Sequence, residues 1–163
     1  MELLGGIFEH SSWIAFEAWD KKPFASLEDL YEAMWSVVQE ATPAQQLALI
    51  RAHPDLVGQG AREGRLTEAS NREQARAGLN QLSTQELKSF DEWNAQYWDR
   101  FGFPFIICAK ENKKELILRA FPIRLKQTPE EEKMTALAEI KKIAWYRLLE
   151  TFDSTSLNPE RNS

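Results

Sequence analysis

Residues 53–74 read H-P-D-L-V-G-Q-G-A-R-E-G-R-L-T-E-A-S-N-R-E-Q, a stretch that joins two expected helices through a loop rich in glycine. Pro54 disfavours the α conformation of His53, so the helix that starts after Thr42 is expected to end there. Unpaired carbonyls at a helix C-terminus favour a protonated imidazole, and we expect them to keep the pKa of His53 near neutrality. His53 is therefore a candidate general acid/base, with a simple helix cap as the alternative interpretation.

Three polar residues at the end of this stretch would share one face of a helix. Ser70, Glu73 and Gln74 are spaced i, i+3, i+4, so a helix would present a hydroxyl, a carboxylate and an amide together. Ser70 and Glu73 also match an S-x-x-E capping box, in which Ser70 would start the helix instead. The glycines of the preceding loop lack the lysine-serine or lysine-threonine of a phosphate cradle, and we expect them to provide mobility or positive φ beside a site.

Helix-start signals recur along the rest of the chain and predict an all-α protein. The expected starts lie at Ser11 or Ser12, Ser26, Thr42, Thr67 or Ser70, Ser83 and Thr128. A short helix over K-K-E-L-I-L-R-A-F is expected to end at Pro122, and the last helix is expected to reach about Phe152. We therefore predict a single compact multi-helix domain of about seven to nine helices over residues 1–153, with a disordered tail over residues 154–163.

The most apolar run of the chain is F-P-F-I-I-C at residues 103–108. Proline and β-branched residues favour an extended start, and the run is too short to distinguish a strand from a buried turn. The run can be a plain wall of the core. If it borders a cavity, however, its free backbone groups could bind the polar edges of a ring while its side chains exclude water.

Arg147 falls on or beside the apolar stripe of the last expected helix, seven residues after Ile140 and four after Ile143. A guanidinium in such a place needs a carboxylate, a group of carbonyls or an anionic or carbonyl-rich ligand. An internal salt bridge to a glutamate is the alternative to a role in ligand binding.

Composition excludes several classes of protein. The 163 residues carry a net charge of −5 and no run of basic residues, so neither nucleic acid nor an anionic membrane is an expected partner. Cys108 is the only cysteine, which excludes an internal disulfide and a thiolate zinc cluster and suits a reducing compartment. The N-terminus has neither a basic region nor a long apolar run, so we expect a cytoplasmic protein.

Several of these motifs, in this order, resemble one known family. H-P-D-L at residue 53, S-x-x-E-Q at residue 70, F-G-F-P-F-I-I-C at residue 101 and K-I-A-W-Y-R-L at residue 142 are similar to motifs of the 2-oxo-4-hydroxy-4-carboxy-5-ureidoimidazoline (OHCU) decarboxylases. The opening L-L-G-G-I-F-E-H-S-S-W is similar to the N-terminus of that family. The resemblance covers residues from about 3 to 150.

The resemblance implies an all-helical homodimer, without metal or cofactor, that converts OHCU to (S)-allantoin and CO2 in urate catabolism. By the same resemblance, His53 and Glu73 are expected to be catalytic. The residues implied in binding substrate are Pro54, Ser70, Gln74, Phe105, Ile107 and Arg147. For Arg147 we expect a contact with a ring or ureido oxygen, because a grip on the departing carboxylate would stabilise the ground state.

Two other functions fit parts of this pattern. A non-catalytic helical module could bind a partner protein through an aromatic surface, given six tryptophans. A lyase or hydrolase for another ureido or hydantoin compound would need the same donors. His10 is expected to be structural, beside Trp13.

Overall fold

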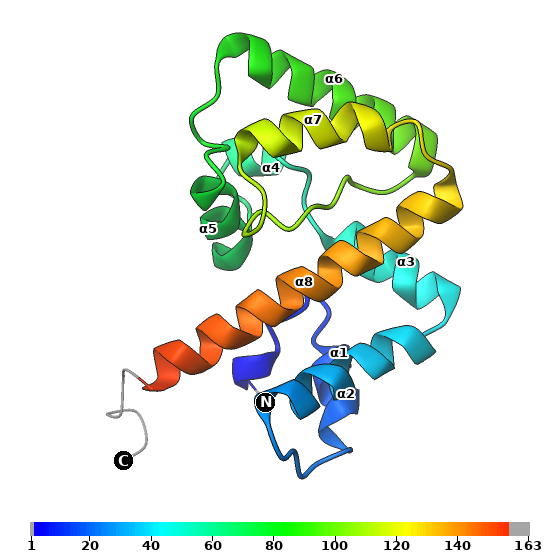
Figure 1. Ribbon diagram of the computed structural model, residues 1–163, viewed down its shortest axis with the longest axis vertical. Coiled ribbons are helices and arrows are strands. Elements are labelled where there is room, and N and C mark those ends of the chain that lie inside the picture. The colour runs from blue at the N-terminus through cyan, green and yellow to red at the C-terminus, as the bar shows by residue number, and fades with distance from the viewer. Residues whose placement is uncertain (1, 157–163) are drawn as a thin grey trace.

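The longest element of the computed structural model is α8 (Pro129–Ser156), a helix of 28 residues that runs diagonally past most of the others (Figure 1). Both α2 and α3 pack against it, as does α6. The other elements are η1 (Glu2–Leu4), α1 (Trp13–Trp19), α2 (Leu27–Glu40), α3 (Pro43–Ala52), α4 (Gln59–Arg62), α5 (Glu68–Arg76), α6 (Thr84–Phe101) and α7 (Lys114–Arg124).

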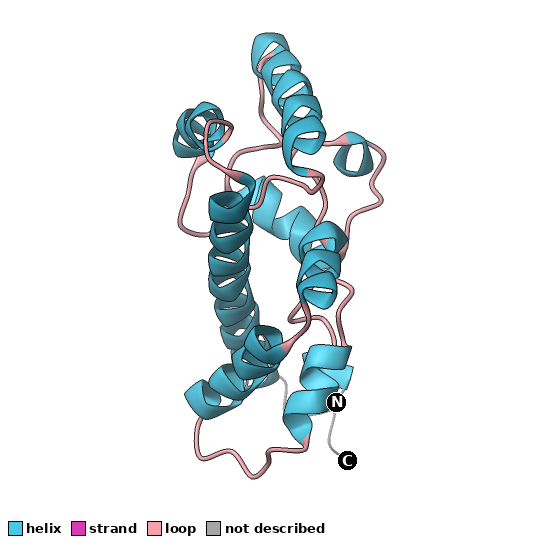
Figure 2. Ribbon diagram, turned by 90° about the vertical axis from the view of Figure 1, so that its right-hand side faces the viewer, coloured by secondary structure: helices cyan, strands magenta, loops and turns pink. Residues whose placement is uncertain are grey.

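The structure describes residues 2–156, and in that part of the chain eight α-helices are joined by loops, with no strand (Figure 2). This confirms the predicted all-α class and the expected number of helices. None of the helices in these residues combines the length and the apolarity needed to cross a lipid bilayer.

Helix starts follow the capping signals in the sequence. Thr42 and Ser83 each form a capping box, in which the hydroxyl accepts the backbone N–H three residues on and that residue's side chain accepts the backbone N–H of the cap. Thr128 and Glu131 form the same reciprocal pair at the start of α8. Gly102 ends α6 with φ of +71°, a conformation that glycine adopts without a steric penalty.

An aromatic cluster fills the core between α6, α7 and the apolar run at residues 103–108. Phe105 stacks on Phe121 with ring centroids 3.8 Å apart, and Tyr97 meets both rings edge-on. The run is neither helix nor strand, and all of its side chains are buried. The core therefore anchors a buried irregular segment, which over residues 104–108 is neither the strand nor the turn that the sequence left open.

The prediction that α7 ends at Pro122 is wrong, because the helix continues to Arg124. Proline removes one backbone donor, a loss that tertiary contacts on both sides of it can offset. Phe121 before it stacks on Phe105, and Arg124 after it binds Glu132 through Nε at 3.0 Å and Nη2 at 2.9 Å.

The loop between α3 and α5 also differs from its prediction. It contains the short helix α4, and Arg62 at the end of α4 pairs with Asp91 of α6. Gly64 has the positive φ expected of a loop glycine, at +67°. At the start of the loop, however, the residue with a positive φ is Val57, at +55°. A β-branched residue there is strained and must be held by its neighbours.

At the C-terminus, α8 extends to Ser156, four residues beyond the end expected at Phe152. Residues 154–156, assigned to the disordered tail from the sequence, are thus helical. The remainder of the predicted tail, residues 157–163, lies outside the described residues.

Candidate active site

A hollow of about 360 Å³, including its open mouth, lies between α3, α5, α8 and the irregular run at residues 103–108. We call it the inner hollow. It is lined by His53, Pro54, Leu56, Ser70, Glu73, Gln74, Phe105, Ile106, Ile107, Ala109, Ile143 and Arg147. Every residue proposed from the sequence as catalytic or substrate-binding is in this lining. The structure thus brings them together, while their chemical roles stay predictions.

His53 is the C-cap of α3, as the following proline predicts, and its side chain is 7% exposed. Its Nδ1 lies 3.1 Å from the carbonyl oxygen of Leu49, one turn back in the helix. A carbonyl can only accept a hydrogen bond, so Nδ1 carries the hydrogen and Nε2 keeps its lone pair. The cap and the acid/base interpretations are therefore compatible, because they use different nitrogens of the ring.

The expectation that the pKa of His53 stays near neutrality is wrong. Burial lowers the pKa to about 4, and the positive charge of Arg147 adds to this effect. The hydrogen bond to Leu49 at the helix end does raise the pKa, as the helix argument requires, but it is outweighed. The imidazole is therefore neutral at physiological pH and has the form of a general base.

Arg147 of α8 is held by two carboxylates at the floor of the inner hollow. It donates to Glu73 from Nε at 2.6 Å and from Nη2 at 2.9 Å, and to Glu9 from Nη1 at 2.7 Å. Burial lowers the pKa of Arg147, but these two carboxylates outweigh burial and raise the pKa above its usual value. Of the two interpretations of Arg147, the internal salt bridge is present in the structure, and Glu73 is committed to it rather than to His53.

Glu9 is a residue of the site that sequence reasoning missed. Its side chain is 2% exposed and accepts hydrogen bonds from Thr67 at 2.7 Å and Ser70 at 3.0 Å, in addition to Arg147. Burial raises the pKa of this carboxyl, but the charge of Arg147 and the Thr67 hydroxyl outweigh burial and hold the pKa below its usual value. The only indication of Glu9 in the sequence is that it is an acidic residue inside the apolar segment G-G-I-F-E-H. Nothing in the sequence links this residue to α5 or α8.

Ser70 is inside α5 rather than at its start, so the capping-box interpretation of Ser70 and Glu73 is wrong. Thr67 caps this helix and accepts the backbone N–H of Ser70. The Ser70 hydroxyl is buried and donates to Glu9. The face formed by Ser70, Glu73 and Gln74 thus points to the inner hollow, as the helical spacing predicts.

Gln74 holds the loop that follows His53. Its Oε1 accepts the backbone N–H of Val57 at 3.0 Å, and its Nε2 donates to the carbonyl of Asp55 at 3.4 Å. Asn94 of α6 donates to the carbonyl of Leu56 at 2.8 Å from the other side. These bonds hold Val57 in its strained conformation and so fix the wall at Pro54 and Leu56.

Arg124 of α7 contacts the apolar wall of the inner hollow at Phe105 and Ile106. Arg124 donates to the carbonyl of Ile106 at 2.5 Å and lies 4.2 Å from the centre of the Phe105 ring. Within residues 2–156, the backbone N–H and C=O groups of Phe105 and Ile107 have no hydrogen-bond partner. Such groups are available to a polar ligand beside side chains that exclude water.

His10, the other histidine, lies outside this lining. Its backbone φ is +46°, its side chain is 69% exposed, and its Nε2 is 3.8 Å from Glu9 Oε1. Nothing in its position gives it the buried acid/base setting of His53.

Comparison with known proteins decides the family. The family model described as OHCU decarboxylase matches residues 1–149 of the chain. The protein belongs to the OHCU decarboxylase family. This confirms the resemblance drawn from the sequence motifs.

Individual OHCU decarboxylase relatives agree over most of the chain. The protein is 37% identical over 156 residues to 2-oxo-4-hydroxy-4-carboxy-5-ureidoimidazoline decarboxylase of Mus musculus. The aligned region covers 96% of this chain and 88% of the mouse protein. A crystal structure of (S)-allantoin synthase matches with a TM-score of 0.74 and 33% identity, over 92% of this chain and 48% of the solved one. A crystal structure of OHCU decarboxylase in the presence of (S)-allantoin has the same fold, with a TM-score of 0.76 over 94% of this chain at 24% identity.

In this OHCU decarboxylase family member, several polar groups of the inner hollow remain available to a ligand. Among them are His53 Nε2, the backbone groups of Phe105 and Ile107, and one N–H on Arg147 Nη1, since the other N–H groups of Arg147 are already used. Among the described residues, no three His, Cys, Asp or Glu side chains are placed to bind one metal ion.

Proposed function

We propose that this protein decarboxylates OHCU to (S)-allantoin and CO2, with His53 as the general acid/base. The observation that carries the proposal is the neutral His53 ring, which lines the inner hollow and is fixed through Nδ1, so that Nε2 is left unprotonated. Family membership and the names of the relatives support the substrate.

The substrate itself supplies the electron sink for the reaction. Its carboxylate is attached to a carbon that also bears a hydroxyl and that adjoins a C=N bond. When the C–C bond breaks, its electron pair forms a C=C bond, the C=N pair moves to nitrogen, and that nitrogen takes a proton from the solvent. Transfer of the hydroxyl proton to the neighbouring carbon then gives the carbonyl of the product.

The protein has two tasks in this scheme. His53 Nε2 takes the hydroxyl proton and returns it to the neighbouring carbon from one side, which sets the chirality of the product. The backbone groups of Phe105 and Ile107 orient the ring, and the apolar wall keeps water away from the site of protonation. General acid/base catalysis of this kind contributes about 10²–10⁴-fold.

The charges around the inner hollow favour loss of the carboxylate. Glu9 and Glu73 place two negative charges around the single positive charge of Arg147, which leaves a formal charge of −1 beside a neutral His53. A substrate carboxylate is therefore poorly stabilised here, whereas neutral CO2 is not penalised. The remaining N–H of Arg147 is directed to a ring or ureido oxygen, in line with the expectation from the sequence.

The test follows OHCU made freshly from urate and records the optical activity of the allantoin produced. Protonation in free solution has no preferred face, so the uncatalysed reaction yields racemic product. We expect the protein to accelerate the appearance of the (S) signal. A partner-binding module would leave the uncatalysed rate and racemic product unchanged. An enzyme for another ureido or hydantoin compound would also leave both unchanged, yet would turn over that compound.

The pH dependence of kcat/KM tests the state of His53. A base is active when deprotonated, and burial lowers the pKa of His53 from 6.5 to about 4, which extends the active form toward acid. We expect kcat/KM to stay level from about pH 8 down to about pH 6, and to fall only as the pH approaches 4. Initial rates, corrected for the uncatalysed reaction, measure this. An acid limb centred near pH 6.5 would show an imidazole exposed to water.

Two further properties are part of the proposal. We propose a homodimer, supported by family membership and by exposed apolar side chains such as Phe16 and Met134. Light scattering after size-exclusion chromatography measures the mass of the assembly.

We also propose a cytoplasmic location, supported by the single buried thiol of Cys108, which suits a reducing compartment.

A further inference from the structure

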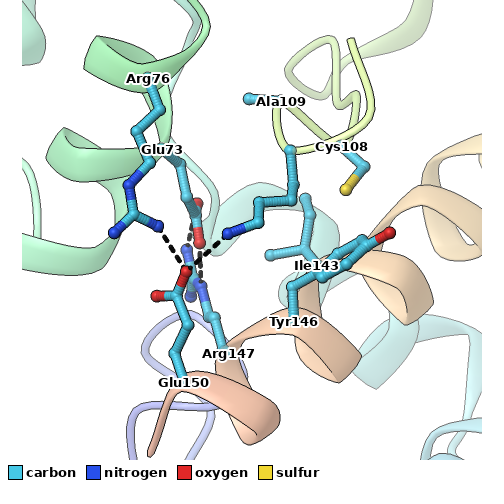
Figure 3. A pocket seen from close by; sticks show the side chains of 9 residues that line it. Glu73, Arg76, Cys108, Ala109, Ile143, Tyr146, Arg147 and Glu150 are labelled. Atoms are coloured by element: carbon cyan, nitrogen blue, oxygen red, sulfur yellow. Dashed lines mark hydrogen bonds and ion pairs between the residues drawn. The ribbon is translucent and has the colours of Figure 1, made fainter. Parts of the chain in front are cut away.

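Two pairs of charged residues bridge α5 and α8 next to each other, with opposite polarity. Glu73 and Arg76 are three residues apart on α5, and Arg147 and Glu150 are three residues apart on α8 (Figure 3). Glu73 pairs with Arg147 in the inner hollow, and Arg76 pairs with Glu150 beside it. The α5 residue is thus acidic in the inner pair and basic in the outer pair.

The outer pair has a second cation. Lys110, in the loop after the apolar run, donates to the same Oε1 atom of Glu150 at 3.1 Å. Burial raises the pKa of the Glu150 carboxyl, but the hydrogen bonds from Arg76 and Lys110 outweigh burial and hold the pKa below its usual value. Two cations against one carboxylate leave a formal charge of +1, the reverse of the inner hollow.

These residues line a second hollow of about 340 Å³, including its mouth, which we call the outer hollow. It shares Glu73, Ala109, Ile143 and Arg147 with the inner hollow, so the two adjoin along a common wall. Arg76 and Lys110 are half-exposed, at 49% and 42%. A ligand from solvent can therefore reach the cations before it meets the negative inner network.

This arrangement addresses a difficulty that the inner hollow poses for an anionic substrate. Arg147 is its one cation among the described lining residues, and two carboxylates already neutralise it. A carboxylate-bearing molecule gains little attraction there, although it must reach His53. Positive charge at the mouth of a cleft raises the local concentration of anions.

We propose that Arg76 and Lys110 form a docking site for the carboxylate of the incoming substrate, and that the Glu150 carboxylate occupies this site until the substrate displaces it. The inference rests on the proposed function only for the identity of the substrate. The chemical class that the site takes is a small carboxylate anion bearing ureido or amide groups.

The position of Glu150 Oε1 marks where an anionic oxygen is stabilised. Both cations donate to that one atom, and charge-assisted hydrogen bonds of this kind are stronger than neutral ones. A half-exposed ion pair is nevertheless worth little in net terms, so exchange of one carboxylate for another costs little. The docked anion is then next to Ile143 and Ala109, which also border the inner hollow.

The test measures equilibrium binding of two probes by calorimetry, without turnover. Allantoate carries a carboxylate and two ureido groups, whereas allantoin is its neutral ring-closed counterpart. We compare the wild-type protein with Arg76→Gln, Lys110→Gln and Glu150→Gln. Arg119→Gln is the matched control for Arg76→Gln and Lys110→Gln, because Arg119 is exposed on α7, lines neither hollow and loses the same single positive charge.

We expect allantoate to bind about five- to tenfold more weakly to Arg76→Gln and Lys110→Gln, and about five- to tenfold more tightly to Glu150→Gln. Arg76→Lys should restore most of the affinity. Allantoin should change less than about twofold in every variant, and Arg119→Gln should match the wild type for both probes. This pattern requires a local anion site, since a structural role would move both probes together.

Three results would overturn the proposal. The first is that each substitution changes the affinities for allantoate and allantoin equally. The second is that Arg76→Gln and Glu150→Gln bind allantoate with the same affinity as Arg119→Gln. The third is that allantoate binds neither the wild type nor Glu150→Gln. A protein that shows the expected pattern but does not decarboxylate OHCU would contradict the proposed function and leave the docking site standing. If the protein decarboxylates OHCU but gives any of the three results, the docking site is contradicted and the proposed function stands.

Discussion

Replacing His53 with asparagine is expected to lower kcat by about 10²–10⁴-fold while the protein stays folded. The Nδ2 amide of asparagine can donate to the Leu49 carbonyl in place of Nδ1, which preserves the end of α3. The substitution removes Nε2, the atom that we propose as the base. Steady-state rates of (S)-allantoin formation, per molecule folded by circular dichroism, measure the effect.

His10→Asn is the matched control for this substitution. His10 is exposed, lines no part of the inner hollow and has a positive φ that asparagine tolerates well. We expect its activity to stay close to that of the wild type. A His53→Asn protein with wild-type kcat would rule out the imidazole as the acid/base.

The same variant has an expected effect on stability against pH. In the wild type the unfolded chain takes up a proton on His53 below about pH 6.5, whereas the folded state does so only near pH 4. Stability is therefore fully present above pH 6.5 and is lost as the pH falls toward 4, by about 3 kcal/mol from this group. His53→Asn should lack this loss, as urea unfolding at pH 7.5 and pH 4.5 would show.

Arg147→Met is expected to destabilise the protein by about 3–5 kcal/mol at neutral pH, because it leaves the buried Glu9 and the partly buried Glu73 without their cation. For a domain of this length that corresponds to a fall in Tm of roughly 10 °C. Acidification should shrink the difference from the wild type. The wild-type stabilisation by Glu9, whose pKa is lowered, is present above about pH 4.5 and is lost as the pH falls through the lowered value.

Two further variants separate loss of charge balance from loss of packing. The triple change Glu9→Gln, Glu73→Gln and Arg147→Met removes all three charges and should regain most of the lost stability. Arg72→Met breaks only the exposed pair with Glu68 on α5 and should cost less than about 1 kcal/mol. A triple variant no more stable than Arg147→Met would mean that the side-chain volume of Arg147, rather than its charge, stabilises the fold.

Helix boundaries were largely predictable because their causes are local. Thr42, Ser83 and Thr128 cap helices through groups three residues away, and Pro54 ends α3 at His53. The errors arose where distant contacts overrode local preference. Pro122 stays inside α7 because residues on both sides of it are anchored in the core.

The membership of the site was also predictable in good part. Helical spacing placed Ser70, Glu73 and Gln74 on one face, and the apolar stripe of α8 placed Arg147 toward the interior. Glu9 was missed because its partners, Thr67, Ser70 and Arg147, are far away in the chain. No spacing rule relates residues in the N-terminal segment to those in α5 and α8.

The sequence by itself thus determined that the chain is all-helical, where most helices start, and which side chains face inward, since these follow from contacts within a few residues. Only the tertiary structure decided which charges pair and in which protonation state His53 exists. Burial and Coulomb interactions depend on distances in space. The helix-end carbonyls, which the sequence reveals, raise the pKa of His53. Burial in a low-dielectric site and the guanidinium of Arg147, which the sequence does not reveal, outweigh them and lower it. The same physics commits Glu73 to Arg147 and leaves Nε2 of His53 unprotonated, the state that the proposed base requires.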